Sequence, residues 1–316
     1  MRVCLMVEGQ EDVTWEQWVA LARAAEEHGL EGLFRSDHYV SVFGEPNRGS
    51  LDAWTTVAAL GAVTERIRLG VLVSPVTFRH PSLLAKAVVT PDHVSNGRVE
   101  LGMGAGWHDL EHRSYGFEFP EGAVRLEMLE EQLELVHRQW SDEVVDFEGR
   151  HYRVRGLRAL PKPAQDPHPN LIVGGRAGPT SVRLAARWAD EYKTILASPG
   201  ECRRRRGKVA RAWERERRDP DTLVFSLMTG CVVGTGRDEV LRRAGRVIEH
   251  TGEGGEPEDF VRDRREDWVV GTTAEVVDGL RELQDAGVDR VMLQHLVPDD
   301  LDMVALLGRE VVPAVA

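Results

Sequence analysis

Asp37 and His38 stand directly after a short apolar run, where a strand is predicted to end. A histidine at such a place can hydrogen-bond a ligand, and its imidazole can take up or release a proton near neutral pH. A pair that merely caps the loop would have the same sequence. Position alone leaves both roles open.

A second stretch, VELGMGAGWHDLEHRSYG at residues 99–116, begins as a buried strand and then alternates glycine with larger residues. Gly102, Gly104 and Gly106 remove side chains from one face, which lets another backbone or a flat ligand approach closely. Barrel-interior packing that needs small residues is the structural alternative. Trp107 follows at the strand tip, where its indole can cover a flat ring or plug the interior.

The polar residues after Trp107 include types that bind metals, namely His108, Asp109, Glu111 and His112. Their spacing is not a strong ligand signature. A polar surface is therefore the favoured interpretation, and the sequence predicts no metal site.

A third stretch, VGGRAGPTS at residues 173–181, leads into a predicted helix. Backbone N–H groups and the helix dipole converge there, which favours a bound phosphate over a plain turn with a capped helix. No Lys-Ser/Thr pair follows the glycines, so the stretch is not a Walker loop. The chain has no GxSxG motif and no cysteine in a catalytic context, so these signatures of a hydrolase are missing.

Short apolar runs alternate with amphipathic runs along the chain, as the helix at 14–29 illustrates, with Thr14 placed to cap it and Gly29 to end it. Such alternation favours parallel strands, and about eight units predict one (β/α)8 TIM barrel over residues 1–316, with an open doubly wound sheet as the runner-up. A hairpin is expected at 144–154 and a loop at 251–267. The predicted strands are 2–8, 32–37, 67–76, 99–106, 171–175, 191–196, 223–234 and 289–296.

Composition excludes several classes of protein. The net charge is −12, which argues against nucleic acid as a partner, and the basic run at 203–218 is interpreted as a solvated helix face. Cys4, Cys202 and Cys231 form no CxxC motif and indicate a reducing compartment. No apolar run is long enough to cross a membrane, so a cytoplasmic protein without a membrane partner is expected.

The stretches 27–39, 63–120, 171–190 and 269–295 together resemble the bacterial luciferase-like superfamily of flavin- or deazaflavin-dependent oxidoreductases. The resemblance implies a TIM barrel that binds FMN or coenzyme F420 without a covalent bond at the strand ends. It places Asp37 and His38 beside the cofactor ring and a non-prolyl cis peptide at Leu72-Val73. It also places Gly104, Ala105 and Gly106 along the polyol chain and Gly174, Gly175 and Arg176 at the phosphate.

The forms SDHY and GAGW resemble the F420-using branch more closely, which implies hydride transfer between F420 and a small organic substrate, with His38 as proton relay. Some sugar-phosphate dehydrogenases of that branch carry a glutamate where this chain has Trp107, so another substrate than glucose 6-phosphate is expected, with Trp107 over the substrate side. The variable loops 39–51, 107–121 and 251–267 are expected to determine the substrate.

Three alternatives stay open at this point. An FMNH2-dependent monooxygenase keeps the fold and changes the reaction, a barrel without catalysis would only bind or assist, and a hydrolase would use a metal at His108, Asp109 and His112. By analogy with the superfamily, the chain is expected to form a homodimer.

Overall fold

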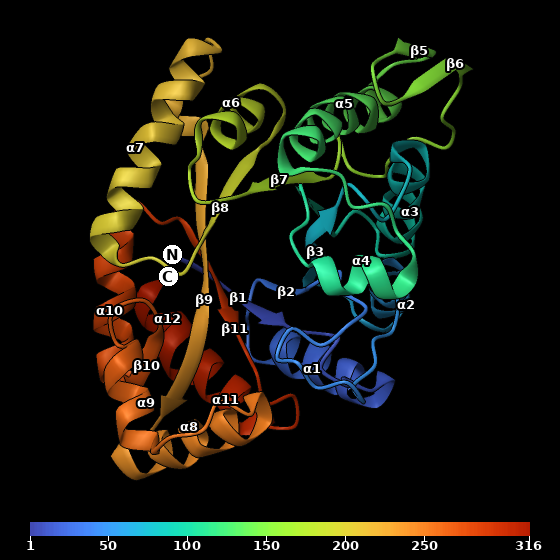
Figure 1. Ribbon diagram of the computed structural model, residues 1–316. Helices are drawn as coiled ribbons and strands as arrows, with labels where there is room; N and C mark the ends of the chain where they lie inside the picture. Colours follow the sequence, from blue (N-terminus) through green and yellow to red (C-terminus); the bar gives the residue numbers. More distant parts are fainter.

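The computed structural model describes all 316 residues, and parallel strands form a closed barrel with helices outside it (Figure 1). The strand order is β9-β11-β1-β2-β3-β4-β7-β8, and pairing of β8 with β9 closes the ring. The (β/α)8 TIM barrel is thus confirmed. Its strands are β1 (Arg2–Val7), β2 (Gly32–Arg35), β3 (Arg68–Pro75), β4 (Val99–Gly104), β7 (Asn170–Gly174), β8 (Glu191–Ile195), β9 (Val224–Gly234) and β11 (Arg290–Gln294).

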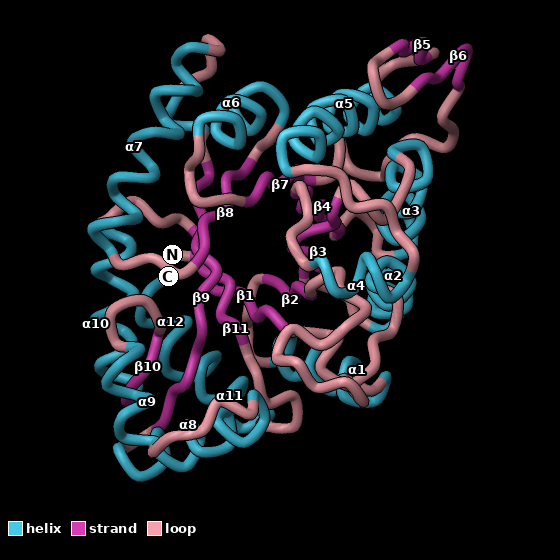
Figure 2. Tube along the Cα trace, in the orientation of Figure 1, coloured by secondary structure: helices cyan, strands magenta, loops and turns pink.

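Helices connect successive strands and cover the outside of the ring, as Figure 2 shows. The first helix begins as predicted, because Thr14 and Gln17 form a capping box, and Gly29 follows its end with φ 77°. The helices are α1 (Trp15–Glu27), α2 (Ala53–Val63), α3 (Pro81–Val94), α4 (Asp109–Tyr115), α5 (Gly122–Ser141), α6 (Pro179–Trp188), α7 (Pro199–Arg215), α8 (Arg237–Thr251), α9 (Pro257–Arg264), α10 (Thr273–Asp285), α11 (Leu301–Leu306) and α12 (Val312–Val315), with a 3-10 turn at Pro220–Thr222 and a π turn at Leu307–Val311.

Two additions to the barrel test the sequence predictions. The expected hairpin is present as the antiparallel pair β5 (Val145–Glu148) and β6 (Arg153–Leu157), which projects beyond the barrel (Figure 2). The predicted loop at 251–267 is wrong in its middle, where α9 forms because Phe260 and Val261 bury their side chains against α8. A further strand, β10 (Val269–Thr272), was not predicted and pairs with the end of β9.

The main core lies between the strands and the surrounding helices, whereas a second cluster fills the middle of the barrel. Side chains alternate across each strand, so every second residue of β1 points inward. The inner cluster consists of Cys4, Met6, Phe34, Leu72, Ile172, Met228 and Met292. This apolar cluster separates the polar side chains at the amino ends of the strands from those at the carboxyl ends. No helix combines the length and the apolar character that a membrane crossing requires.

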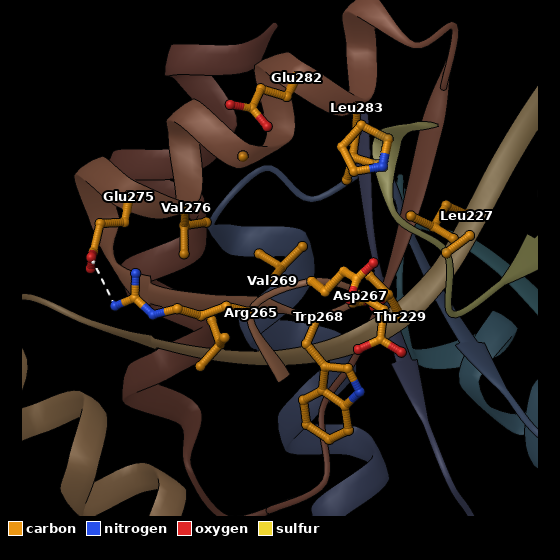
Figure 3. A pocket seen from close by; sticks show the side chains of 15 residues that line it. Leu227, Thr229, Arg265, Asp267, Trp268, Val269, Glu275, Val276, Glu282 and Leu283 are labelled. Carbon is orange, nitrogen blue, oxygen red and sulfur yellow. Dashed lines mark hydrogen bonds and ion pairs between the residues drawn. The ribbon is translucent and has the colours of Figure 1, made fainter. Parts of the chain in front are cut away.

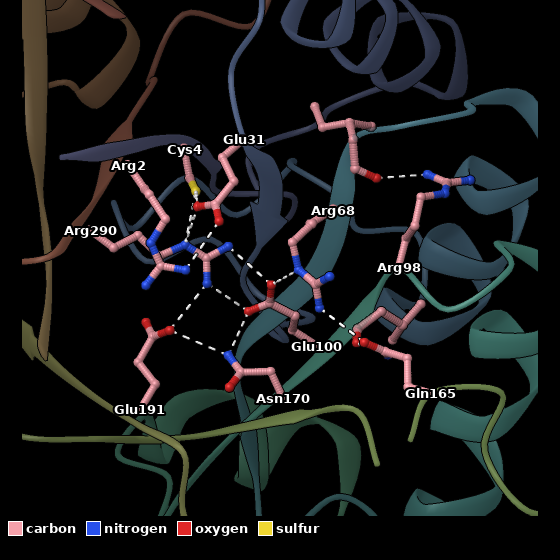
Figure 4. A network of polar contacts seen from close by, with 12 residues as sticks. Arg2, Cys4, Glu31, Arg68, Arg98, Glu100, Gln165, Asn170, Glu191 and Arg290 are labelled. Atoms are coloured by element: carbon pink, nitrogen blue, oxygen red, sulfur yellow. Dashed lines mark hydrogen bonds and ion pairs between the residues drawn. The ribbon is translucent and has the colours of Figure 1, made fainter. Parts of the chain in front are cut away.

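At the amino ends of the strands, Arg290 lies within a network of carboxylates (Figure 4). Its Nε is 2.7 Å from Glu31 Oε2, and its Nη1 is 2.7 Å from Glu100 Oε2 and 3.1 Å from Glu191 Oε2. Burial favours the neutral form of Glu100, but Arg290 and Arg68 outweigh it and lower the pKa of Glu100 to about 2. This end of the barrel is closed by paired charges.

Candidate active site

A cavity of about 740 Å³ opens at the carboxyl ends of the barrel strands. Its volume is in the range of small-molecule sites, and active sites of such barrels form at this face. Ten of the eleven predicted site residues line it, namely His38, Leu72, Val73, Gly104, Ala105, Gly106, Trp107, Gly174, Gly175 and Arg176. Segments more than 130 residues apart in the chain therefore meet at one cavity, as the predicted barrel requires.

Asp37 is the exception, because the structure does not place it on the cavity wall. Its carboxylate accepts hydrogen bonds from Arg79 Nη1 at 2.5 Å and Nη2 at 3.2 Å, and from Ser74 Oγ at 2.9 Å. Trp54 donates to the same Ser74 hydroxyl at 2.9 Å. Asp37 thus lies behind the cavity wall and holds the end of β3. The sequence analysis had expected it beside the ligand.

His38 forms a hydrogen-bonded pair with Glu111, a residue that the sequence did not single out for catalysis. Nδ1 of His38 is 2.8 Å from Glu111 Oε1, and the backbone N–H of Tyr39 donates to Glu111 Oε2 at 3.0 Å. Glu111 is buried, and the two side chains belong to elements 73 residues apart. A carboxylate at Nδ1 places the proton of neutral imidazole there, so Nε2 is left as the acceptor.

The pKa of His38 is raised above its ordinary value. Burial alone would lower it, but the hydrogen bond and the negative charge of Glu111 outweigh burial, with smaller contributions from Glu8 and Asp37. His38 therefore changes charge at a higher pH than an isolated histidine. That property suits a group that both accepts and donates protons near neutral pH.

Trp107 stands at the mouth of the cavity, with 63% of its surface exposed. Its ring centroid lies 5.5 Å from that of His38 in a T-shaped arrangement, and the ring of His108 lies 5.8 Å from His38. Trp107 is thus free to cover a ligand that enters beside His38.

The polar residues after Trp107 are not simply a polar surface, as the sequence had suggested. His112 is buried like Glu111, with Nε2 2.6 Å from Thr77 Oγ1 and Nδ1 2.7 Å from the His108 carbonyl oxygen. Both ring nitrogens of His112 therefore have protein partners. No group of three His, Cys, Asp or Glu side chains in the chain is arranged to hold a metal. The hydrolase with a metal at His108, Asp109 and His112 has no support in this arrangement.

The glycines of β4 make room for β3. A Cβ on Gly102 would lie 2.5 Å from the Val71 carbonyl oxygen, and one on Gly104 would lie 2.6 Å from Val73 Cγ2. The pairing of β3 with β4 shifts register between Val71 and Ser74, and the Leu72-Val73 peptide bond is cis, as the family resemblance implied. At Gly102, the missing side chain therefore makes room for the backbone of β3 and not for a ligand. Gly104 and Gly106 line the cavity, where they also leave room for a ligand.

The turn between β7 and α6 offers backbone and charge to an anion. Arg176 is exposed and forms no ion pair, and Gly178 precedes α6 without a side-chain cap, so N–H groups of the first helical turn lack side-chain partners. Tyr192 Oη supports the turn from behind, since it accepts a hydrogen bond from the Ala177 N–H at 2.8 Å. The arrangement suits a phosphate.

Besides Glu111, four polar residues line the cavity that the sequence analysis did not assign to the site: Glu8 after β1, Ser36 after β2, Lys193 in β8 and Gln294 at the end of β11. The alternation within EYKTI was the available signal, because Glu191 points inward at the closed end and Lys193 must then face the same way.

A smaller cavity of about 160 Å³ lies between β9, β10 and α10 (Figure 3). Arg265 and Glu275, which form an ion pair at 3.0 Å, border it together with Trp268. It contains none of the predicted site residues. The expectation that the segment 251–267 lines the substrate site is not met, because its last three residues line this smaller cavity and none lines the larger one.

Comparison with known proteins is consistent with this geometry. The family described as luciferase-like monooxygenase matches residues 3–290. An F420-dependent glucose-6-phosphate dehydrogenase from Nakamurella multipartita is 38% identical over 175 residues, which cover 55% of this chain and 50% of the relative. The chain thus spans about half the length of this curated relative.

Two solved structures match the whole fold. An F420-dependent secondary alcohol dehydrogenase in complex with an F420-acetone adduct has a TM-score of 0.83 at 22% identity, covering 100% of this chain and 99% of that one. The monooxygenase RslO1 from Streptomyces bottropensis has a TM-score of 0.85 at 24% identity, covering 100% of both chains. At these identities the likeness establishes the fold alone, and the reaction has to be inferred from the residues of the site.

Proposed function

The chain belongs to the luciferase-like monooxygenase family, and from this premise we propose that it is an F420-dependent oxidoreductase acting on a small organic substrate. The observation that carries the proposal is the pair of His38 and Glu111 at a cavity that also contains a phosphate-compatible turn. The name of the 38% identical relative supports F420 over FMN.

The residues present fit a long, flat cofactor with a phosphate. A Cβ on Gly174 would lie 3.3 Å from both Lys193 Cε and Val73 Cγ1, so a larger residue would crowd the space that a ligand needs. Leu72 and Val73 would hold the ring, the backbone from Gly104 to Gly106 would lie along the polyol chain, and Gly174, Gly175 and Arg176 would hold the phosphate.

The cofactor would supply a ring carbon that accepts or donates a hydride. The protein then has to orient the substrate and move one proton. His38 Nε2 would accept a proton from a substrate hydroxyl in oxidation, or donate one to a substrate oxygen or nitrogen in reduction. Glu111 keeps the imidazole in the orientation and tautomer that this role needs, and Trp107 would cover the substrate and exclude water.

The substrate proposed is a small alcohol, ketone, enone or imine. A sugar phosphate fits less well, because the position where the resemblance implies a carboxylate carries the indole of Trp107. We also expect the protein to act as a homodimer in the cytoplasm, which sedimentation and cell fractionation would test.

Titration of the purified protein with F420 and, separately, with FMN tests the proposal, with tryptophan fluorescence as the readout. A Trp107→Phe variant should lose most of the signal while equilibrium dialysis still detects binding. Micromolar binding of F420 with much weaker binding of FMN is expected. The reverse preference would refute the proposal and favour the FMNH2-dependent monooxygenase, whose oxygen consumption would then be the assay.

A further inference from the structure

Lys193 is a buried cation at the cavity without a carboxylate partner. The residue is 6% exposed, and the one polar atom near its Nζ is Met228 Sδ at 3.9 Å. No Asp or Glu oxygen lies within 4.0 Å of this ammonium group, whereas Arg290 has three carboxylates at that range. A cation buried in this way costs several kcal/mol unless another group compensates for its charge.

The neighbouring carboxylates are engaged elsewhere. Glu8 accepts a hydrogen bond from Gln10 Nε2 at 2.9 Å and another from Gln294 Nε2. Glu191 accepts from the Ser226 hydroxyl and from Arg290 Nη1. Both still act on Lys193 through space, but burial dominates and lowers the pKa of Lys193 to about 8. The protein therefore maintains a positive charge at neutral pH that it leaves available to the cavity.

The position of Lys193 on the wall indicates which ligand it serves. Its Cε and Nζ would lie 3.3 and 3.7 Å from a Cβ on Gly174, and Val73 Cγ1 borders the same point at 3.3 Å. Val73 is proposed to hold the ring, whereas Gly174 opens the turn proposed to hold the phosphate. Met228, which Lys193 Nζ contacts, packs in the inner cluster with Leu72, so Lys193 lies on the ring side of this point. His38 and Trp107, which would meet the substrate, follow other strands.

We propose that Lys193 binds the ring portion of the cofactor and favours its reduced form. This inference rests on the proposed function. In oxidation of an alcohol, the substrate C–H bond would break, its electron pair and hydrogen would pass to the cofactor as a hydride, and His38 would take the hydroxyl proton. A hydride delivered without its proton would bring one negative charge to this part of the cavity. A nearby buried cation stabilises that charge more strongly than a solvated cation would.

Isothermal titration calorimetry with oxidised and with reduced F420 tests the inference on four proteins. These are the wild type, Lys193→Met, Lys193→Arg and the control Lys208→Met, which removes an exposed lysine of α7. The wild type and the control should bind the reduced form more tightly than the oxidised form. Lys193→Met should lower that ratio about tenfold, equivalent to ~30 mV for a two-electron couple, and Lys193→Arg should retain most of it.

Thermal unfolding without cofactor separates this role from a structural one. Lys193→Met should unfold at a higher temperature than the wild type, because it replaces an unpaired buried charge by an apolar side chain of similar length. An unchanged ratio in Lys193→Met, or an equal loss of both affinities with lower stability, would overturn the inference and leave the proposed function intact. If the wild type binds neither form, both the inference and the proposed function fail.

Discussion

At the amino ends of the barrel strands, all three nitrogens of Arg290 contact acidic side chains, those of Glu31, Glu100 and Glu191. At the carboxyl ends, Lys193 is almost as deeply buried and contacts none, and His38 uses one of its two ring nitrogens. The same barrel thus holds one polar cluster whose partners are complete and one whose partners are not.

The comparison shows how a site can be recognised in a fold that hosts many reactions. Buried polar groups are normally satisfied by the protein, so those left without partners indicate where a ligand completes the structure. The closed end then contributes to a unique fold, and the open end retains polar groups that cost stability and serve binding.

The largest effect is expected from breaking the closed end. Arg290→Met leaves Glu191 buried without a cation and Glu100 with Arg68 alone, and it should lower the free energy of unfolding by about 3–5 kcal/mol in urea denaturation. The control Arg2→Met removes a half-exposed arginine that also contacts Glu31 and should cost less than about 1 kcal/mol. Equal losses in the two variants would show that the network does not close the barrel as described.

At the open end, His38→Ala should reduce turnover rather than stability. We expect kcat with F420 and the first alcohol, enone or imine found to react to fall about 100-fold, because the proton relay is lost, with little change in the unfolding temperature. His93→Ala, which alters an exposed histidine of α3, is the matched control. A variant that keeps wild-type kcat would remove His38 from the mechanism.

Glu111→Gln sharpens the comparison by removing one charge from the open end. The pKa of His38 should fall, because the hydrogen bond to a carboxylate and its charge raise it in the wild type. The neutral imidazole then prevails down to a lower pH, and kcat should fall about tenfold through loss of orientation. Titration of the His38 ring by NMR measures the first effect, and the control is Glu130→Gln, which alters a carboxylate of α5 that pairs with Arg183. An unchanged pKa would contradict the role of Glu111.

The smallest effect is expected at the exposed turn before α6. Arg176→Gln should weaken F420 binding about fivefold, and the loss should diminish at high salt because the arginine is exposed. Arg187→Gln, an exposed arginine farther along α6, should leave the affinity unchanged. If both variants bind as the wild type does, the phosphate is held elsewhere.

The sequence predicted all barrel strands, because apolar runs separated by capped helices are local patterns. It missed β10 and α9, whose four and eight residues form through contacts with β9 and α8. The sequence predicted those residues of the cavity that stand in recognisable motifs at the ends of strands. The pairing of His38 with Glu111 was not, because it joins residues 73 positions apart and depends on how α4 packs.

Asp37 and Lys193 both show that the sequence does not reveal which way a side chain points. Asp37 stands in a motif but turns its carboxylate to Arg79, and Lys193 stands in an ordinary strand yet faces the cavity. A side chain's direction at a strand end depends on its partners, which a single sequence does not display.

Hydrogen–deuterium exchange with and without F420 tests the central claim most directly, since it reports on both ends of the barrel at once. Added F420 should slow exchange in residues 104–115 and 174–178 and leave the amino ends of β4, β8 and β11 unchanged. Protection by FMN but not by F420, or no protection at the carboxyl ends, would contradict the assignment of the open end as an F420 site.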